Sequence, residues 1–414
     1  MLKQIIFENW KTYRSAVLPI DPLTVLIGTN ASGKSNAIDA LEFLNRTTLG
    51  KKIANALTGI RGGIEWATWR PQTQFTLKAL VQGEDETIDY LYSITVETKP
   101  RVHLLAESLV RIKKDSLTSN SIAQVHLFKT NEPLGDTIRV EFYQDNKPDF
   151  ELLFHYFHSF LAMAAAIDTN MAAAIDTKKE VIEGSKIVLE TIQNIFILNP
   201  IPSLMRDFSL LSDSFKSDAS NIAGVLAALP DERKAEVEAT LSTYVKHLPE
   251  RDIQRVWAEP VGRLKTDAML YCEELWKPGQ TTEIDARGMS DGTLRFLAIL
   301  TALLTRPEGS QLVIEEVDNG LHPSRAELLL RMLREIGEKR KIDVLVTTHN
   351  PALLDALGPE MVPFVVVAHR DTETGESKLT LLEDIENLPK LMASGPLGKL
   401  ATKGAIERSL SDTN

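Results

Sequence analysis

Residues 28–36, GTNASGKSN, combine two glycines, hydroxyl side chains and one lysine in a pattern suited to binding phosphate. The glycines allow successive backbone N–H groups to turn toward an anion at a helix N-terminus. The run LTVLI before the loop and NAIDALEFL after it predict the strand and helix that such a loop needs. We expect Lys34 to reach the β- and γ-phosphates and Ser35 to ligate Mg²⁺. The residues expected to contact the nucleotide are Gly28, Asn30, Ser32, Gly33, Lys34, Ser35 and Asn36.

A second group of reactive side chains follows two later apolar runs. The run QLVIEE ends in Glu315 and Glu316, and His349 follows the run DVLVTT. Two ionised carboxylates at a buried sheet edge are costly without a cation, which favours a functional pair over simple surface charge. We expect Glu315 to hold the water shell of Mg²⁺ and Glu316 to orient or deprotonate an attacking water. His349 can donate a hydrogen bond to the γ-phosphate.

The elements around these residues predict an α/β fold. Strands alternate with helices at both ends of the chain, which indicates a parallel sheet. Three alternating stretches between residues 75 and 112 predict an antiparallel sheet. The pattern from about residue 150 to 248 is mostly helical, interrupted by a strand-like piece at 195–200.

This pattern predicts four parts. Residues 1–145 form an N-terminal lobe with the phosphate loop and the antiparallel sheet, and residues 146–255 form a mainly helical insertion. Residues 256–385 form a C-terminal lobe with the paired acids and the histidine, and residues 386–414 form a tail. The expected fold is therefore a nucleotide-binding fold that is split by inserted material.

Composition narrows the possible partners and compartment. The net charge of -11 argues against nucleic-acid binding through bulk electrostatics and leaves only local patches, such as Lys11 with Arg14. The single cysteine excludes an internal disulfide and fits a reducing compartment. The N-terminus lacks the apolar core of a secretory signal, and no apolar run of about 18 residues occurs. We expect a cytoplasmic protein without a membrane partner.

Several other features receive a structural interpretation. Trp10 packs in a core as readily as it contacts a base, and His322 fits a structural role or a position at a subunit seam. His155 and His158 are expected on one face of an aromatic core helix, where no third metal ligand is evident. The sequence MAAAIDT at 163–169 and 171–177 indicates a local duplication that lengthens a helix or loops out.

Four motifs together resemble an ATPase head of the ABC class: GTNASGKSN, MSDGTLR at 289–295, LVIEEVDNGLHP at 312–323 and THNP at 348–351. The pattern is most similar to the branch of RecF, SMC and OLD-type proteins, and within it to stand-alone bacterial ATPases with paired glutamates followed by GLHP. The segments ENWKTY and SLMRDFSLLSDSFKSDASNIAGVLAAL also resemble that group. The resemblance implies a P-loop NTPase of ABC-type head fold, with a mixed central sheet, an antiparallel β subdomain and a helical insertion.

The resemblance also implies that two subunits sandwich ATP and Mg²⁺ between their heads, as a homodimer or a higher oligomer. Ser290 and Gly292 would then meet the γ-phosphate bound by the partner subunit, and Asp318 would lie at the seam. Asp291 stands where transporters have glycine, and Glu315 replaces the usual aspartate. A glutamine that closes over Mg²⁺ has no clear match, and Asn199 or Gln193 is the candidate.

The implied function is an ATP-driven dimeric switch that controls a separate effector. The chain after His349 is too short for an OLD-type nuclease domain, so the effector expected by resemblance is another protein, such as a Toprim-type or HNH nuclease in defence against phages or mobile DNA. The alternative is a RecF-like repair clamp that binds DNA directly across paired heads. A scaffold that hardly hydrolyses ATP is disfavoured because Glu316 is present.

Overall fold

The computed structural model describes residues 1–114, 122–144, 147–165, 176–249 and 252–411. The chain forms two compact units that share the sequence in alternation. Unit 1 contains residues 1–21, 28–195 and 366–380, and unit 2 contains residues 22–27, 196–365 and 381–414. The chain therefore passes from one unit to the other five times.

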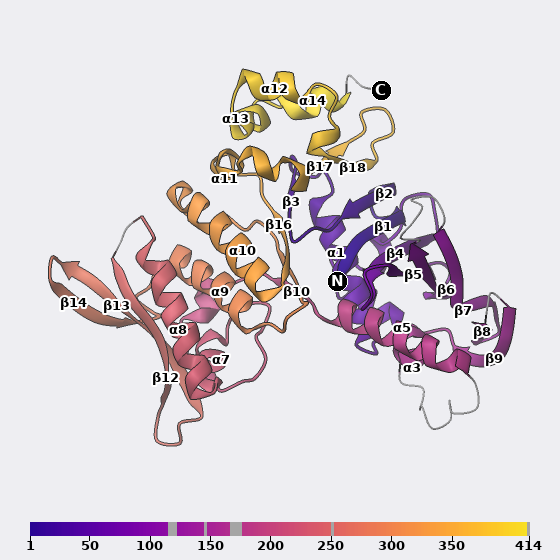
Figure 1. The fold of residues 1–414 in the computed structure, drawn as a ribbon, viewed down its shortest axis with the longest axis horizontal. Helices are drawn as coiled ribbons and strands as arrows, with labels where there is room; N and C mark the ends of the chain where they lie inside the picture. Colours follow the sequence, from indigo (N-terminus) through magenta and orange to yellow (C-terminus); the bar gives the residue numbers. More distant parts are fainter. Residues whose placement is uncertain (115–121, 145–146, 166–175, 250–251, 412–414) are drawn as a thin grey trace. The chain divides into compact units, whose positions relative to one another are not determined.

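Unit 1 is built on an antiparallel eight-stranded sheet with the order β2-β1-β4-β5-β6-β7-β8-β9 (Figure 1). Its strands carry alternating apolar residues, as expected for a sheet with one covered face. The alternating stretches predicted between residues 75 and 112 are confirmed as β4, β5 and β6. The strands are β1 Leu2–Trp10, β2 Tyr13–Pro19, β4 Gln74–Gln82, β5 Ile88–Glu97, β6 His103–Lys114, β7 Ile122–Leu134, β8 Thr137–Gln144 and β9 Lys147–His155.

The helices of unit 1 include α1 (Lys34–Thr48), which follows the phosphate loop, and α5 (Asp176–Gln193), which contacts it. Trp10 of β1, Phe43 of α1 and Phe75 of β4 pack ring against ring in the core, with centroids 4.8–5.8 Å apart. This aromatic contact fixes α1 to the sheet. The remaining short elements are α2 Ile53–Thr58, η1 Ile64–Trp66 and α3 Leu161–Ala165, with β17 Val365–Arg370, which unit 1 contains from Val366, and β18 Ser377–Leu381, which it contains up to Thr380.

Unit 2 contains parallel strands that are buried along their whole length. β15 (Gln311–Ile314) pairs in parallel with β16 (Asp343–Thr347), and β16 pairs in parallel with β3 (Leu23–Ile27). All three are continuous apolar runs, as in sheets covered on both faces. β10 (Ile195–Leu198) neighbours β15, so the strand predicted at 195–200 is confirmed. The carboxyl ends of β15, β16 and β3 lie at one edge, as the sequence predicts for parallel strands.

The helices of unit 2 include three long ones, α8 (Asp231–Lys246), α9 (Asp291–Thr305) and α10 (Ala326–Arg340). Leu329, Leu333 and Ile336 lie on the buried face of α10, as their spacing predicts. A second sheet of antiparallel strands contacts α7 and α8 (Figure 1). The further elements are α6 Pro202–Met205, β11 Ser209–Leu210, α7 Ile222–Ala228, β12 Ile253–Val261, β13 Asp267–Lys277, β14 Gln280–Asp285, η2 Pro323–Arg325, α11 Pro351–Ala356, η3 Pro359–Phe364, η4 Leu382–Asp384, α12 Leu388–Ser394, α13 Leu397–Thr402 and α14 Ala405–Ser411.

The structure corrects the helical interpretation of LLFHYFHSF. His155 ends strand β9, and residues 156–158 form a turn and a bend, so His155 and His158 do not share a helix face. The aromatic residues in this stretch are compatible with a strand or a helix. The pairing of β9 with β8 shows that the stretch is a strand up to His155. The MAAAIDT duplication at 163–169 and 171–177 lies largely outside the described residues.

Candidate nucleotide-binding site

The phosphate loop of unit 1 depends on glycine at two positions. Gly28 has φ of 143° and Gly33 has φ of 117°, which side chains with a Cβ rarely adopt. A Cβ at Gly28 would lie 2.1 Å from the carbonyl oxygen of Ala368, and one at Gly33 would lie 2.8 Å from the hydroxyls of Ser377 and Tyr13. These contacts leave no room for a larger residue, so the backbone shape of the loop is fixed.

The loop has the features of a phosphate cradle. The Nζ of Lys34 donates to the carbonyl oxygens of Gly28 (2.6 Å) and Thr29 (3.0 Å), which folds its charge over the loop. Ser32 is 1% exposed, and its buried hydroxyl has no hydrogen-bond partner among the described residues. Buried polar groups are rarely left unpaired, so this hydroxyl fits a ligand oxygen. The residues present thus fit a nucleotide phosphate, and Ser35 at the start of α1 offers a hydroxyl for Mg²⁺.

Residues of β1, β2 and the turn between them form a layer that holds the phosphate loop through hydrogen bonds. The indole N–H of Trp10 donates to the carbonyl oxygen of Asn36 (2.7 Å), and the Tyr13 hydroxyl donates to the carbonyl oxygen of Gly33 (2.9 Å). The Asn36 side chain donates to the Thr12 hydroxyl at 2.7 Å. Trp10 and Tyr13 are fully buried, so Trp10 packs in the core and is not placed to stack on a base.

A buried ion pair holds the start of α1 to this layer. Lys11 is 8% exposed, and its Nζ lies 2.5 Å from the carboxylate of Asp39. Arg61 approaches the other carboxylate oxygen at 2.9 Å and donates to the carbonyl oxygen of Ser35. Burial lowers the pKa of Lys11 below its usual value, while Asp39 opposes that shift. Lys11 therefore neutralises Asp39 and is not available for bulk nucleic-acid contact.

Sequence reasoning did not find Asp39 or Arg61. The signal for Asp39 is its position in NAIDALEFL, where a carboxylate stands among residues of the buried helix face. A buried carboxylate requires a cation, so this position predicts a partner such as Lys11. Arg61 carries no such signal, because it comes from a turn far along the chain from Ser35.

The paired acids follow β15 at the carboxyl edge of the unit 2 sheet. Glu316 has φ of 48°, a left-handed conformation that is uncommon outside glycine. Its carboxylate lies 4.0 Å from Nδ1 of His349, and the two side chains are 46% and 53% exposed, respectively. Glu316 follows the buried strand as expected, and its side chain is partly open to solvent. The structure does bring Glu316 and His349 together, and it places both where a solvent molecule can reach them.

Asp318 lies inside the loop that follows the acids. It is 9% exposed and accepts a hydrogen bond of 2.5 Å from the Thr348 hydroxyl. Thr348 also accepts from the backbone N–H of Asn350 (3.0 Å), whose side chain caps α11. Asp318 thus connects the acid loop with the segment around His349, a link that the sequence did not predict.

The segment MSDGTLR forms the beginning of α9. Ser290 is the N-cap, and its hydroxyl accepts from the backbone N–H of Thr293 at 3.1 Å. Arg206 donates to the carbonyl oxygen of Met289 (3.0 Å) and to the carboxylate of Asp291 (2.6 Å). Ser290 and Asp291 are exposed, and Arg206 offsets the charge of Asp291.

Gly292 is buried at the same helix start. A Cβ at this position would lie 2.8 Å from the carbonyl oxygen of Gly320 and 3.1 Å from Nη1 of Arg325. Gly292 therefore allows close packing between α9 and the loop that follows the paired acids. Its backbone remains at the helix N-terminus, where amide groups can meet an anion.

Three weaker candidates have local structural contacts. Gln193 donates to the carbonyl oxygen of Thr48 (2.9 Å) at the C-terminal end of α1, and so it is bound at the end of the helix opposite the phosphate loop. Asn199 is exposed just after β10, and its backbone N–H donates to the carbonyl oxygen of Ser217 (2.8 Å). His322 caps the short helix η2 through Ser324, which agrees with a structural role.

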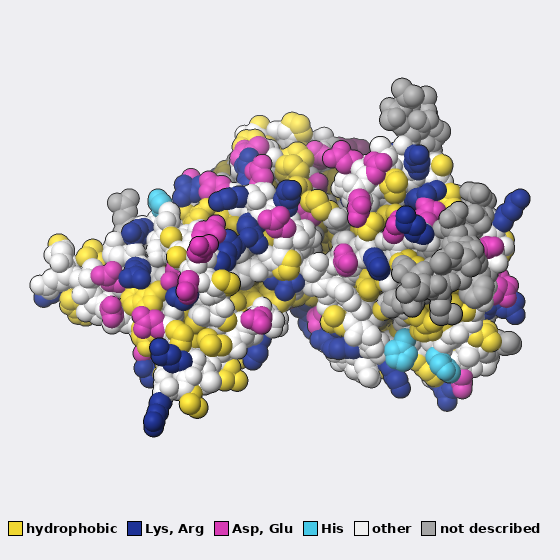
Figure 2. Space-filling view, turned by 60° about the horizontal axis from the view of Figure 1, so that its bottom comes forward, with side chains coloured by type: hydrophobic (Ala, Val, Ile, Leu, Met, Phe, Trp, Pro, Cys, Tyr) yellow, Lys and Arg dark blue, Asp and Glu magenta, His cyan; other side chains and the backbone are white. Residues whose placement is uncertain are grey.

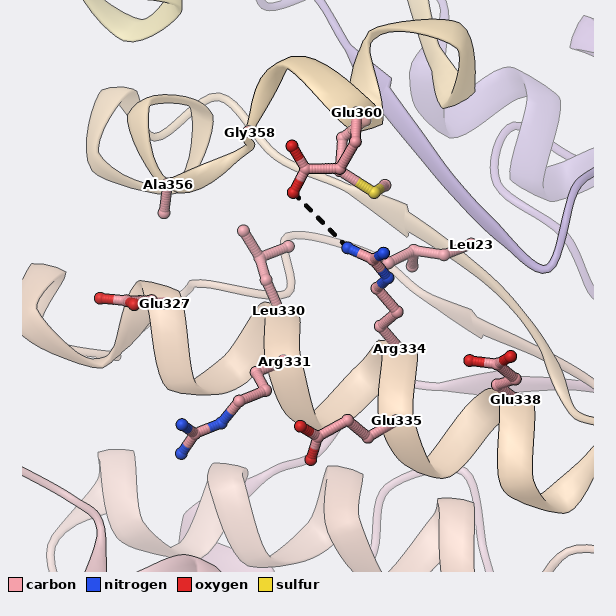
Figure 3. A pocket seen from close by; sticks show the side chains of 11 residues that line it. Leu23, Glu327, Leu330, Arg331, Arg334, Glu335, Glu338, Ala356, Gly358 and Glu360 are labelled. Atoms are coloured by element: carbon pink, nitrogen blue, oxygen red, sulfur yellow. Dashed lines mark ion pairs between the residues drawn. The ribbon is translucent and has the colours of Figure 1, made fainter.

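A groove in unit 2 lies apart from the carboxyl edge. It has a volume of about 410 Å³ and includes Leu23 at the amino end of β3 in its lining. Figure 3 shows Arg334 of α10 pointing toward Glu360 of η3, an ion pair of 3.5 Å. Leu23 lies at the amino end of β3, whereas the paired acids and His349 follow the carboxyl ends of the parallel strands β15 and β16. The groove is therefore separate from Glu316 and His349.

The surface charges are mixed. Figure 2 shows basic and acidic side chains interspersed over the described part of one face. None of the helices in the described ranges is long and apolar enough to cross a membrane. Within the same ranges, no group of three or more His, Cys, Asp or Glu side chains could hold a metal ion.

Two family models match adjoining parts of the chain. Residues 1–199 match the family described as "AAA ATPase domain". Residues 204–355 match the family described as "AAA domain, putative AbiEii toxin, Type IV TA system". The first match contains the phosphate loop, and the second contains the segment MSDGTLR, the paired acids and His349.

Solved structures with similarity to the chain are heads of SMC proteins. The SMC head bound to the C-winged helix domain of ScpA has a TM-score of 0.49 and 12% identity, over 92% of this chain and 96% of that one. The SMC head domain from Thermotoga maritima has a TM-score of 0.42 and 14% identity, over 92% of this chain and 98% of that one. A third structure is the Smc head domain with an extended coiled coil, bound to the C-terminal domain of ScpA derived from Pyrococcus furiosus. It has a TM-score of 0.46 and 10% identity, over 95% of this chain and 99% of that one.

No curated protein matches the chain. The assignment therefore rests on the motifs, on the loop geometry and on the two family models. The strand β3, the phosphate loop and the helix α1 follow one another as a nucleotide-binding loop requires. The two ATPase models together cover residues 1–199 and 204–355, which supports an ABC/SMC-like ATPase head.

Proposed function

We propose that the chain binds Mg²⁺ and ATP, hydrolyses ATP and pairs with a second head when ATP is bound. The observation that carries the proposal is the phosphate cradle, in which Gly28 and Gly33 shape the backbone and Lys34 supplies the charge. The unpaired Ser32 hydroxyl supports a ligand oxygen at the same loop. Gly28 is bonded directly to Ile27 of β3, so the loop begins at the strand edge that Glu315 also follows.

The residues divide the chemistry between them. Lys34 would balance the charge of the β- and γ-phosphates, while Ser35 and the water shell at Glu315 would hold Mg²⁺. When bound, Mg²⁺ neutralises the charge that develops on the transferred phosphoryl group. Glu316 would accept a proton from the attacking water or orient it, and His349 would hydrogen-bond the γ-phosphate. Exposure of both side chains supports this role, because solvent water can reach each of them.

The beginning of α9 supports the proposed pairing of heads. Ser290 is exposed at a helix N-terminus, and the buried packing of Gly292 fixes the direction of the helix. The positive end of the helix dipole would attract an anion on a second subunit. We propose that ATP bound to one head meets Ser290 and Gly292 of another.

The same proposal includes an effector protein. The description of the family model over residues 204–355 names a putative toxin and a toxin–antitoxin system. This description supports a protein that interferes with processes of the cell. By resemblance we propose a separate nuclease of Toprim or HNH type, acting in defence against phages or mobile DNA. Co-purification of the tagged chain from its native cells tests this part, and the absence of any nuclease from the recovered complex would contradict it.

The deciding experiment is the solution mass of the Glu316→Gln protein, measured by light scattering with and without Mg-ATP. Slow hydrolysis should keep the nucleotide bound, and we expect the mass to double on addition of Mg-ATP. The matched control carries Lys34→Ala as well and should stay at its starting mass. A protein that binds ATP but remains monomeric would refute pairing between identical heads. A high mass without ATP would assign assembly to other surfaces.

A further inference from the structure

The backbone at Glu316 is held in an unusual conformation by its neighbours. Its φ of 48° lies in the left-handed region, where a non-glycine residue stays only when surrounding contacts require it. The backbone direction at this residue determines where the Glu316 carboxylate points. The contacts that maintain the conformation therefore control the position of the expected water-activating group.

Thr347 supplies two of these contacts from the end of β16. Its hydroxyl accepts a hydrogen bond from the backbone N–H of Glu316 at 2.8 Å. Its carbonyl oxygen accepts from the backbone N–H of Val317 at 3.0 Å. Thr347 is fully buried, so solvent cannot replace the hydroxyl if it is removed. One residue thus binds two consecutive amides of the acid loop.

Thr348 makes the corresponding connection on the other side. Its hydroxyl donates to Asp318 (2.5 Å) and accepts from the backbone N–H of Asn350 (3.0 Å). Thr348 is fully buried and Asp318 nearly so. The segment that carries His349 is therefore fixed to the loop that carries Glu316.

We propose that Thr347 and Thr348 are positioning residues that set the distance and direction between Glu316 and His349, an inference that rests on the proposed ATPase function. Neither hydroxyl is free to take part in chemistry, since both are engaged with the backbone or with Asp318. Their effect on hydrolysis passes through Glu316 and His349, whose facing atoms are 4.0 Å apart. A displacement of about 1 Å at such groups can cost roughly 100-fold in rate.

The test uses variants that separate the hydroxyl from the shape of the side chain. Thr347→Val and Thr348→Val keep the branched shape and remove the oxygen, whereas Thr347→Ser and Thr348→Ser keep the oxygen. Thr301 of α9 supplies the matched control, because it is fully buried in the same unit and its hydroxyl has no hydrogen-bond partner within the described part of the chain. Thr301→Val removes a buried threonine hydroxyl without breaking a bond.

We expect each threonine-to-valine variant at 347 and 348 to lower kcat about 10- to 100-fold while KM for ATP changes less than about threefold. Both serine variants should retain most of the activity, and Thr301→Val should match the original protein. Full activity in a valine variant would overturn the assignment for that threonine. So would a serine variant as slow as its valine counterpart, because packing would then be the cause.

A second measurement does not depend on activity. The Glu316 amide should exchange with deuterium at least about tenfold faster in Thr347→Val than in Thr347→Ser, because only the serine can accept its hydrogen bond. Unchanged exchange would overturn the positioning role even in an active enzyme. If the original protein shows no ATP turnover, the proposed function fails, whereas faster exchange in Thr347→Val would still support the bond to Glu316.

Discussion

The Lys34 side chain folds back over its own loop, and its ammonium group donates hydrogen bonds to two backbone carbonyl oxygens. A phosphate would offer this ammonium group stronger, charge-assisted bonds than the carbonyl groups do. Loss of those bonds in Lys34→Ala should weaken ATP binding about 100-fold or more, as measured by calorimetric titration. Lys51→Ala, which removes an exposed charge in the same unit, should bind ATP like the original protein. Retained affinity in Lys34→Ala would refute the loop assignment.

Single residues differed in how far the sequence could reveal them. Gly28, Gly33 and Lys34 follow a spacing that backbone geometry requires, so the pattern alone places them. Thr347 is different, because threonine in a buried β-strand is also a common packing residue. Its bond to the Glu316 amide depends on strand pairing between distant segments. Such contacts can be found only when the register is known.

At the level of elements, the N-cap of α9 connects stability with the proposed pairing of heads. Ser290→Ala removes the acceptor for the Thr293 amide and should lower the free energy of unfolding by about 1 kcal/mol. Ser290→Asn keeps a capping side chain and should retain most of that stability. Urea denaturation followed by circular dichroism measures both variants. If Ser290→Ala is as stable as the original protein, the cap contributes nothing to folding.

The elements also show where pattern analysis succeeds. Long apolar runs such as LTVLI and DVLVT predict buried parallel strands, and the regular spacing in α10 predicts its buried face. The sheet of β12, β13 and β14 was not predicted. Its β14 strand is almost wholly exposed and lacks apolar alternation, so pairing with β13 is the main signal that it is a strand.

At the level of the whole molecule, the repeated passage of the chain between its two units predicts joint unfolding. Cys272 on β13 reports on unit 2, because it is fully buried and burial raises its pKa to about 12. In the native protein at pH 8 the thiol is covered and protonated, so iodoacetamide should modify it only after unfolding. We expect the urea midpoint for alkylation to coincide with that from circular dichroism. Alkylation at clearly lower urea would show that the units unfold separately.

The same thiol predicts a pH dependence of stability. Its ordinary pKa is 9.0, and the folded value is higher, so the unfolded chain loses this proton first as the pH rises. Stability should therefore decrease through the interval from about pH 9 to 12, by up to about 1.4 kcal/mol per pH unit from this group. Cys272→Ala should show a smaller decrease over the same interval.

One wall of the phosphate loop comes from residues far downstream of it in the chain. Ala368 and Ser377 are the residues that a Cβ at Gly28 or Gly33 would strike, and the Ser377 hydroxyl donates to Thr12. During synthesis the ribosome makes the loop early and this wall roughly 340 residues later, which takes about 20 to 70 s at common translation rates. A nascent chain therefore carries the loop without its support during this interval, and competence to bind nucleotide arises only after Ala368 and Ser377 have been made.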